Sequence, residues 1–507
     1  MLRHRVVSLS VVCLLVASAI VLGWFAGIGR ATTYPSAAFH VDGTVANEFS
    51  ANSVALLDLN SDGVADLAVG APFNGTGGLK NAGSVSFFLS QVVGSAIVPF
   101  QHVITVSGSA AGDLFGWSLA NVGDVSGLGP ALAVGAPHAS PGGHAQAGNI
   151  TLFFPSATFG GKAGAWINST NAGENLGYSI APGGDVNGDN FADLLAGAPF
   201  CSTGAAAGGC AYIFYGGSPH PSLTPSLSFD SAVVGAHFGW SVAGNGSVDG
   251  TSALDLVVGA PNYTSGGLAA RGAAYVIRNP TGTVRTSIVP GAGAGDEFGF
   301  SVALGDFNGD AIDDVAVGAP YNSGAFTQAG DVSIIYGGSP FKTTIGAILN
   351  GRAADEWFGY ALASGNFHRD NLDDLLIGAP GSTINATGIG RAYGYYGSPL
   401  PWTAANLTLV PGVSGAYAFG ASVTVGGNFT VGGGPGYVVG DPQFQVGSKV
   451  NVGRAYMYAG DIVPTQNFPR VLGWVCVPYT LTGGTNPCSG LAGFAVTLES
   501  TTLPFST

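Results

Sequence analysis

Short apolar runs separated by polar, glycine-rich loops recur along most of the chain. The stretch from Phe298 to Pro320 shows the pattern: an aromatic-glycine pair opens an apolar run, an acidic loop follows, and a second apolar run ends at Gly318-Ala319-Pro320. Short runs rich in Val and Ala, bounded by Gly, Asn, Asp or Pro, are typical of β-strands rather than helices. The stretch therefore predicts a β-hairpin with a tight loop.

The same hairpin pattern occurs seven times. Six copies close with Gly-Ala-Pro, starting at residues 70, 135, 197, 259, 318 and 378, and the last closes with Gly440-Asp441-Pro442. Before each closure stands an aromatic-glycine pair or its relic: Phe49-Ser50, Phe115-Gly116, Leu176-Gly177, Phe238-Gly239, Phe298-Gly299, Phe358-Gly359 and Phe419-Gly420. Two more apolar runs follow each hairpin, so a repeat of about sixty residues holds four strands, as a propeller blade does. We therefore expect an all-β fold, a seven-bladed β-propeller of four-stranded blades.

The two ends of the repeat region complement each other. Residues 38–41 look like the fourth strand of a repeat, whereas the seventh repeat reaches its third run at Tyr456 and has no obvious fourth. We predict that this N-terminal strand pairs with residues 454–459 and completes the last blade. The pairing would close the ring and remove its open edge.

Three of the seven loops carry the same polar residues at loop positions one, three, five and nine. They are Asp58, Asn60, Asp62 and Asp66; Asp185, Asn187, Asp189 and Asp193; and Asp306, Asn308, Asp310 and Asp314. The residues at position seven, whose backbone carbonyls would add a ligand, are Val64, Phe191 and Ile312. Oxygen ligands at this spacing suit calcium, in a loop shorter than that of an EF-hand. A turn rich in Asp and Asn that holds no metal has the same composition.

The other loops match in part. The sixth has Asn366, His368, Asp370 and Asp374, where His at position three is a poor calcium ligand. The fourth has Asn245, Ser247, Asp249 and Asp255, with two extra residues before the last Asp. We expect these to be weaker metal sites. The second loop retains Asp124, and the seventh has no acid, so we expect both to be metal-free turns.

The aromatic-glycine start, the acidic nine-residue loop and the Gly-Ala-Pro closure together resemble FG-GAP repeats, best known from the head of integrin alpha chains. The resemblance covers residues 38–460. It implies a seven-bladed β-propeller, calcium in hairpin loops on one face, and adhesion or partner binding on the opposite face. It does not imply a whole integrin, because the sequence shows no second transmembrane segment and no series of domains after the propeller.

Composition supports an acidic, turn-rich β protein. The formal charge is −14, charged residues make up 9% of the chain, and Gly contributes 84 of 507 residues. Glycine in this amount without a collagen period, beside many short β-prone runs, indicates an all-β fold with many turns. Nucleic acid is not an expected partner, because binding phosphates needs basic patches.

The N-terminal segment predicts export. Residues 1–31 begin with Arg3 and Arg5 and continue in an apolar run from Val6 to Gly29. This is typical of a signal peptide cleaved after Ala31, although the run is also long enough for an uncleaved membrane anchor. In either case we expect residues 32–507 to be extracellular or at the cell surface.

The cysteines agree with an oxidising compartment. Spacing suggests two local disulfides, Cys201 with Cys210 and Cys476 with Cys488, and a zinc site is the weaker alternative. Asn-x-Ser/Thr sequons are compatible with a glycoprotein, although chance also explains them in such a composition; they lie at Asn74, Asn149, Asn168, Asn245, Asn262, Asn385, Asn406 and Asn428. Residues 461–507 lie beyond the propeller (residues 32–460) and predict a small disulfide-containing β-appendage.

Two further motifs recur. Gly-x-Ser, half of a hydrolase nucleophile motif, stands at 116, 177, 239 and 299, and its recurrence indicates strand construction rather than catalysis. The residue after each aromatic-glycine pair is aromatic in five repeats: Trp117, Tyr178, Trp240, Phe300 and Tyr360. These side chains could hold a partner's Lys or Arg by cation–π attraction, as the integrin resemblance also suggests, or could simply pack between blades.

We therefore expect an exported, calcium-binding β-propeller that recognises or adheres to a protein or glycan on a cell surface or matrix, and not an enzyme. One alternative is a structural subunit of a surface layer or filament. Another is a glycan-active enzyme with its site in the central channel. A carboxylate pair at the channel mouth, outside the cation loops, would favour the enzyme.

Overall fold

In the residues that it describes, the computed structural model consists of β-strands and turns, with a short 3-10 helix at Pro141–Gly143. It describes Ala37 and residues 39–459, except 76–77, 94–95, 283, 385–388, 400–401, 403 and 429–434. The predicted signal or anchor segment, residues 461–507 and the Cys476–Cys488 pair lie outside the described residues. These features and the domain boundaries stay predictions.

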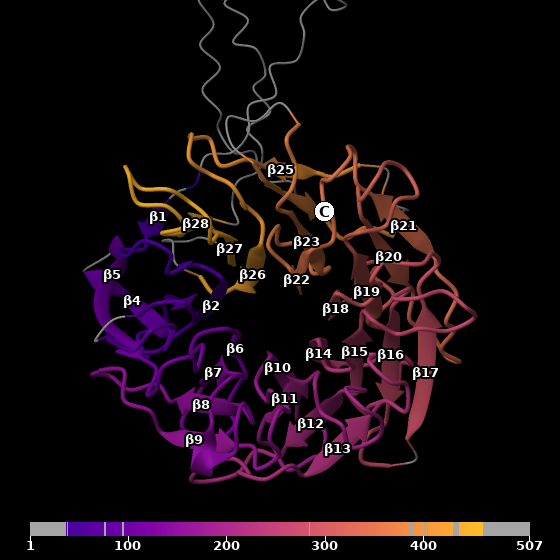
Figure 1. Ribbon diagram of the computed structural model, residues 1–507, viewed down its shortest axis with the longest axis horizontal. Coiled ribbons are helices and arrows are strands. Elements are labelled where there is room, and N and C mark those ends of the chain that lie inside the picture. Colours follow the sequence, from indigo (N-terminus) through magenta and orange to yellow (C-terminus); the bar gives the residue numbers. More distant parts are fainter. Residues whose placement is uncertain are drawn as a thin grey trace, which may run out of the picture.

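Seven antiparallel four-stranded sheets stand side by side as the blades of a ring (Figure 1). In blades one to six the four strands follow one another in chain order, as successive hairpins do. The first strands of neighbouring blades contact one another around the whole ring, so they form its inner wall. The predicted seven-bladed propeller is confirmed.

The strands divide evenly among the blades. Blade one has β2 (Ser53–Leu57), β3 (Asp66–Ala71), β4 (Ser84–Val93) and β5 (Ala96–Ser107); blade two has β6 (Leu119–Asn121), β7 (Leu132–Ala136), β8 (Asn149–Phe153) and β9 (Ala165–Asn168). Blade three has β10 (Ser179–Gly184), β11 (Asp193–Ala198), β12 (Cys210–Phe214) and β13 (Leu227–Asp230); blade four has β14 (Ser241–Gly246), β15 (Asp255–Ala260), β16 (Ala273–Arg278) and β17 (Arg285–Pro290). Blade five has β18 (Ser301–Gly305), β19 (Asp314–Ala319), β20 (Asp331–Ile335) and β21 (Ala347–Asn350); blade six has β22 (Ala361–Gly365), β23 (Asp374–Ala379), β24 (Arg391–Tyr395) and β25 (Leu407–Leu409). Blade seven has β26 (Ser422–Gly426), β27 (Gly436–Asp441), β28 (Arg454–Tyr458) and the N-terminal β1 (Phe39–Asp42).

The N-terminal strand closes the ring as predicted. β1 pairs antiparallel with β28, and Val41 lies opposite Ala455. At the end of the pair the carboxylate of Asp42 accepts from the guanidinium of Arg454, 2.8 Å from Nη2 to Oδ2. That guanidinium also lies 3.9 Å from the ring centre of Phe444. The outermost strand of blade seven is therefore fixed by ladder hydrogen bonds, an ion pair and a cation–π contact.

The core lies between blades rather than inside one sheet. The second strand of every blade is entirely buried, as in β3 and β19. Side chains from facing blades interdigitate; Phe87 of blade one and Phe153 of blade two, for example, have ring centres 5.2 Å apart. A single blade could not bury both of its faces, so stability depends on the complete ring.

Close contact between blades explains the two glycines of each repeat. Gly116 has φ of 86°, a left-handed conformation that favours glycine. A Cβ atom on Gly70 would clash with the carbonyl oxygen of Gly116 in the next blade. The glycine of the opening pair is thus needed for its backbone angle, and the glycine of the closure is needed because two backbones nearly touch.

The opening pair of the first repeat is one residue later than predicted. Ser50 bridges Gly453 as Phe115 bridges Gly83, and Ala51 has the left-handed φ of 66°. Ser50-Ala51, not Phe49-Ser50, therefore takes the place of the aromatic-glycine pair. Phe49 instead packs against Phe73, with ring centres 5.2 Å apart, and this contact holds an aromatic side chain near the position that the motif predicted.

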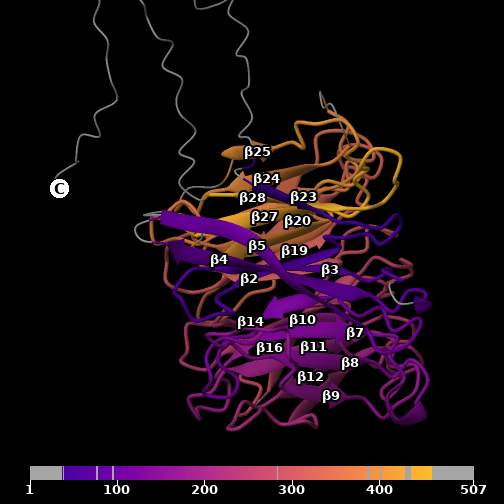
Figure 2. The same ribbon diagram turned by 90° about the vertical axis from the view of Figure 1, so that its left-hand side faces the viewer.

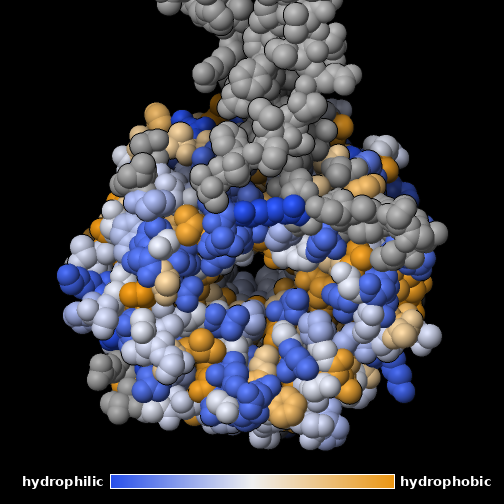
Figure 3. Space-filling view, turned by 180° about the vertical axis from the view of Figure 1, so that it is seen from behind, coloured by the Kyte–Doolittle hydropathy of each residue, from blue (hydrophilic) through white to orange (hydrophobic). Residues whose placement is uncertain are grey.

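Two views show the outside of the molecule. β4 and β5, the longest strands, extend beyond their neighbours along the outer side of the ring (Figure 2). Seen from behind, hydrophilic residues border much of the central opening, a hydrophobic group lies on its right-hand side, and other hydrophobic residues are scattered (Figure 3). Among the described residues no helix is long and apolar enough to cross a membrane.

Candidate functional site: acidic loops and an aromatic arc

The acidic loops and the aromatic residues lie at opposite ends of the inner strands. In blade one Leu57 pairs with Asp66 at the end where the acidic loop connects β2 to β3. Ser53 pairs with Gly70 at the other end, beside the opening and closing motifs. The same registers recur in blade five, so the cation loops and the opening motifs face opposite sides of the ring.

The carboxylate at position nine fastens each complete loop to its blade. Asp66 is fully buried, and its Oδ2 accepts from the backbone N–H of Leu59 at 2.8 Å. Its Oδ1 accepts from the N–H of Ser90, which lies in the third strand, β4, at 2.8 Å. Asp193 and Asp314 make the equivalent pairs of contacts. The position-nine residue therefore joins the loop to β4, or to the residues just after β12 and β20 in the other two blades, whatever else it binds.

The hydrogen bonds to these carboxylates do not offset the effect of burial on their pKa. Burial raises the pKa of Asp66 to about 7, against the hydrogen bonds from Ser90 and Leu59, and the charges of Asp58 and Asp62 raise it further. The pKa of Asp314 is likewise raised to about 7 and that of Asp193 to about 6, in both cases mainly by burial. A divalent cation beside these groups would relieve the repulsion, so the all-oxygen donor set fits a hard cation such as calcium.

The exposed part of each complete loop is organised by its own backbone. In loop one, Asp58 accepts from the N–H groups of Asp62 at 3.2 Å and Gly63 at 2.8 Å. The amide of Asn60 donates to Asp62 Oδ2 at 3.1 Å. Loops three and five repeat this pattern. The predicted residues thus lie together in three identical turns, an arrangement that agrees with both the calcium and the Asx-turn interpretations.

The fourth loop has normal length, which corrects its predicted register. The N–H of Val248 donates to Asp255 Oδ2 at 2.9 Å, the contact that position two makes with position nine elsewhere. Ser247, Asp249 and Thr251 therefore occupy positions one, three and five. Asn245 is outside the loop, in a β-bulge that shifts the pairing of β14 with β15 between Ala243 and Gly246. The two extra residues belong to this bulge.

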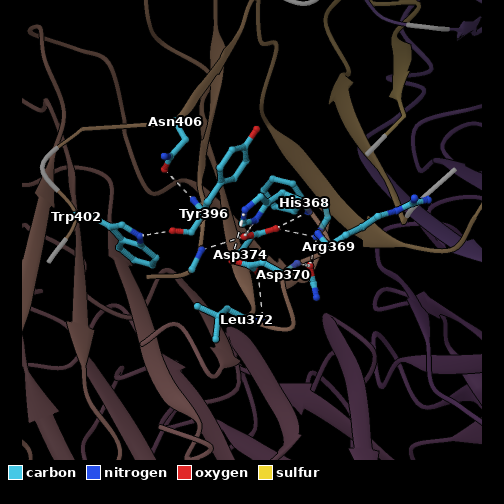
Figure 4. Close-up of polar contacts among 11 residues, drawn as sticks. His368, Arg369, Asp370, Leu372, Asp374, Tyr396, Trp402 and Asn406 are labelled. Atoms are coloured by element: carbon cyan, nitrogen blue, oxygen red, sulfur yellow. Dashed lines mark hydrogen bonds and ion pairs between the residues drawn. The ribbon is translucent and has the colours of Figure 1, made fainter. Parts of the chain in front are cut away.

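Loop six, Asn366 to Asp374, places a histidine nitrogen among its carboxylate oxygens (Figure 4). His368 Nδ1 lies 3.0 Å from Asp374 Oδ1, and Nε2 lies 3.4 Å from Asp370 Oδ2. Within the described part of the chain, these three residues form the one group of three His, Cys, Asp or Glu side chains whose ligand atoms all lie within 4.8 Å of one another. Burial raises the pKa of Asp374, whereas the contact with His368 lowers it.

The second loop is a tight turn in which Asp124 accepts from the backbone N–H groups of Ser126 and Gly127. Asp58 of loop one makes contacts of the same kind, so the expectation that the second loop is a metal-free turn stays a prediction. Most of the seventh loop lies outside the described residues.

The five predicted aromatic residues form a continuous arc. The ring centres of Trp117 and Tyr178 are 5.3 Å apart, those of Tyr178 and Trp240 4.7 Å, those of Trp240 and Phe300 5.7 Å, and those of Phe300 and Tyr360 4.8 Å. All five side chains are partly exposed and lie outside the buried clusters between the blades. We call these five residues the aromatic arc. In blades one and seven, Asn52 and Ala421 take the equivalent positions, so the arc covers five of the seven blades.

An acid that the sequence analysis did not single out lies beside the arc. Glu297 is partly exposed, and burial raises its pKa. Burial raises the pKa of Tyr360 and raises that of Tyr321 to about 12, and the charge of Glu297 raises both further. Tyr321 in turn contacts Phe300, with ring centres 6.0 Å apart. Glu297 precedes an aromatic-glycine pair, but sequence spacing alone does not place it near the arc.

The serine of the Gly-x-Ser motif has a structural role. Ser118 Oγ donates to the carbonyl of Gly177 in the next blade at 2.7 Å. The same bond occurs at six blade boundaries, from Ser53 to Gly116, Ser118 to Gly177, Ser179 to Gly239, Ser241 to Gly299, Ser301 to Gly359, and Ser422 to Ala51. We call this bond the serine latch. The bond explains why Gly-x-Ser recurs, and it agrees with the prediction that the motif builds the blades rather than a catalytic site.

The structure bears on one of the two predicted disulfides and on one of the predicted glycosylation sites. The disulfide between Cys201 and Cys210 is present and ties the loop after β11 to the start of β12. Among the sequons, Asn74 is only 5% exposed, and its amide donates to Glu48 Oε2 at 2.7 Å. This asparagine is therefore inaccessible to a glycan in the folded protein.

Comparison with known proteins identifies the repeats. A family model described as FG-GAP repeat matches residues 50–88, 176–208 and 298–335, the three repeats with complete acidic loops. The chain is 27% identical to a Dictyostelium discoideum phosphatidylinositol-glycan-specific phospholipase D over 39% of this chain and 24% of that protein. It is 28% identical to Mus musculus integrin alpha-3 over 32% of this chain and 15% of that protein. It is 35% identical to Xenopus laevis integrin alpha-5 over 29% of this chain and 14% of that protein.

The matched segments thus span a quarter or less of these relatives. Their names include both an enzyme and integrin alpha chains, so the matches give the chain a repeat type and not an activity. The family match agrees with the structure, because each matched segment contains a complete blade hairpin with its acidic loop. The chain therefore contains FG-GAP repeats, and parts of it are similar in sequence to integrin alpha chains.

Proposed function

We propose that this propeller is an exported recognition module that uses calcium structurally and binds a partner on a cell surface or matrix through the aromatic arc. The observation that carries the proposal is the arc itself. Five partly exposed rings contact one another at one end of the inner strands, and a contiguous apolar surface of this kind commonly marks an interaction site.

The chemistry of the arc favours a cationic side chain from a protein partner. The faces of Trp, Tyr and Phe attract Lys and Arg, more strongly where water is excluded. Glu297, beside Tyr360 and Tyr321, adds negative charge at one end of the arc. The acidic chain as a whole, with formal charge −14, would also speed encounter with a basic partner.

Calcium has a supporting role in the proposal. Three loops with identical donors lie at the far end of the inner strands, and ions there would hold β2, β10 and β18 in place without touching the partner. Export agrees with the N-terminal segment and with the disulfide, since disulfides persist in oxidising compartments. The proposal assigns the Gly-x-Ser hydroxyls to the serine latch and no catalytic step to the chain.

Binding of the purified protein to arrays of basic peptides and of glycans, in calcium, tests the proposal. We expect peptides that present Lys or Arg beside apolar residues to bind, and Trp117→Ala with Trp240→Ala to abolish binding while the melting temperature stays within a few degrees. Trp166→Ala, an exposed tryptophan on β9 and away from the arc, is the matched control. Binding that survives loss of both arc tryptophans would exclude the arc as the recognition surface.

Calcium is tested separately by thermal unfolding with calcium and with a chelator plus magnesium. A calcium-specific rise in melting temperature is expected, because an ion that binds only the native state stabilises it. Equal melting temperatures would reduce the three loops to metal-free turns and leave the arc to be judged by the binding experiment alone.

A further inference from the structure

Loop six keeps the frame of the complete loops but differs from them at two positions, with Asn366 in place of Asp at position one and a histidine at position three. As in loop one, the position-nine carboxylate accepts from the N–H of position two, here Phe367 to Asp374 at 2.8 Å. As there, the position-five carboxylate accepts from the N–H of position seven, Leu372 to Asp370 Oδ1 at 3.0 Å. The third position holds His368 where the complete loops hold Asn. The substitution at position three therefore places an imidazole in a scaffold that keeps the position-five and position-nine contacts.

The two ring nitrogens of His368 have different surroundings. Nδ1 lies 3.0 Å from Asp374 Oδ1, a normal hydrogen-bond distance. Asp374 is fully buried and also accepts from the backbone N–H groups of Gly397 and His368. These groups are all donors, so Asp374 acts as an acceptor here, and its Oδ1 can also accept Nδ1–H. Such a bond fixes the tautomer in which Nε2 carries the lone pair.

Nε2 and Asp370 Oδ2 lie 3.4 Å apart, which is long for a hydrogen bond. Two ligands of a tetrahedral zinc ion, each about 2.0–2.2 Å from the metal, lie about 3.3–3.6 Å apart. Both side chains remain accessible, 30% exposed for His368 and 35% for Asp370. Figure 4 shows the imidazole between the two carboxylates, with Tyr396 beside it. The rings of His368 and Tyr396 are stacked, with centres 4.1 Å apart, and this contact holds the imidazole in place.

We propose that loop six is a site for a borderline divalent ion of the zinc class, held by His368 Nε2 and Asp370 Oδ2, with Asp374 orienting the imidazole. A carboxylate that accepts the second N–H of a metal-binding histidine is the common arrangement at such sites. Imidazole nitrogen favours zinc, cobalt or nickel, whereas calcium prefers oxygen. Water completes the coordination at this exposed position. The inference does not depend on calcium in the other loops.

The test uses tag-free protein in millimolar calcium, titrated with Zn²⁺ by calorimetry and with Co²⁺ by visible absorption. We expect one zinc equivalent that calcium does not displace and a cobalt absorption band from mixed nitrogen and oxygen ligands. His368→Asn restores the residue found at this position in the complete loops and should retain the fold. It should remove the cobalt band and lower zinc affinity by more than about tenfold, the loss seen even for weaker perturbations of metal sites.

Two further variants make the result decisive. Asp370→Asn should lose the same zinc equivalent, and His144→Asn, an exposed histidine on another loop, should behave as the parent protein does. An unchanged cobalt spectrum in His368→Asn, or displacement of zinc by calcium, would overturn the proposal. So would the absence of a zinc equivalent in the parent protein.

Discussion

Ser241 Oγ donates a 2.9 Å hydrogen bond to the carbonyl of Gly299, the glycine with which the next blade opens. The bond connects two blades at the point where their backbones come closest. It satisfies a carbonyl that the neighbouring strand does not use, and it recurs at every blade boundary except the one after blade six. There Ala361 stands at the position of the serine. The protein thus contains blade boundaries with the serine latch and one boundary without it.

This difference gives a pair of opposite predictions. Ser241→Ala should lower the free energy of unfolding by about 1–2 kcal/mol, because it removes one hydrogen bond and leaves a buried carbonyl without its donor. Ala361→Ser should raise it by about 0.5–1 kcal/mol by adding a latch toward Gly420. Urea unfolding of both variants measures the change. If Ala361→Ser destabilises as much as Ser241→Ala, the hydroxyl does not act through this bond.

The seven repeats made the fold predictable from sequence, because each hairpin carries its own start, loop and closure. Blade closure was predictable for the same reason: one repeat had a missing strand and the N-terminus had a spare one. The failures occurred where one residue shifts the register. Phe49 matches the motif by type, yet Ser50 makes the blade contact, and the bulge near Asn245 resembles a longer loop. Such shifts depend on hydrogen bonds between segments far apart in sequence.

The candidate ligand residues of the complete loops were predictable from their spacing, but the different structural roles of these residues were not. Position nine binds the backbone at or just after the third strand, which lies outside the motif, so only the folded chain shows that Asp314 holds its loop to the blade. Glu297 and the serine latch were missed for the same reason. Their roles depend on a neighbouring blade that no local pattern specifies.

The two kinds of loop carboxylate should respond differently to mutation. Asp314→Ala should destabilise the protein by about 2–4 kcal/mol with or without calcium, because the N–H groups of Phe307 and Gly337 lose their acceptor. Asp310→Asn keeps the acceptor for Ile312 and should change calcium-free stability by less than about 0.5 kcal/mol, the size typical of surface changes. It should reduce the calcium-induced rise in melting temperature. Calorimetry in calcium and in chelator distinguishes the two.

The disulfide should contribute measurable stability. It links residues nine positions apart, and closing a loop of this length in the unfolded chain corresponds to about 2–3 kcal/mol. The double variant Cys201→Ser with Cys210→Ser should therefore unfold at lower denaturant concentration by that amount. The parent protein in reductant is the matched control. A loss far below 1 kcal/mol would show that the loop after β11 is already restricted in the unfolded state.

Closure by the N-terminal strand can be tested within β1. Val41 is partly buried and packs against the cluster that contains Met457, whereas the neighbouring His40 is exposed. Val41→Asp should destabilise the protein by about 1–3 kcal/mol, because it places a charge against an apolar cluster. His40→Asp, one residue away on the opposite face of the strand, should have little effect. Limited proteolysis should cut β1 first in Val41→Asp, and equal sensitivity of the two variants would mean that this strand adds nothing to the ring.

Asp331 should make stability fall as pH rises. Burial, with a smaller contribution from Asp296, raises the pKa of Asp331 from 3.8 to about 7. Between these values the folded state binds more protons than the unfolded state, so the free energy of unfolding decreases as pH increases through this window. Asp331→Asn removes the titration. Relative to the parent protein, it should therefore gain about 2–4 kcal/mol between pH 4 and pH 8. The exposed Asp230→Asn serves as the control in urea unfolding at each pH. A constant difference between Asp331→Asn and the parent across the window would mean that Asp331 titrates alike in the folded and unfolded chains.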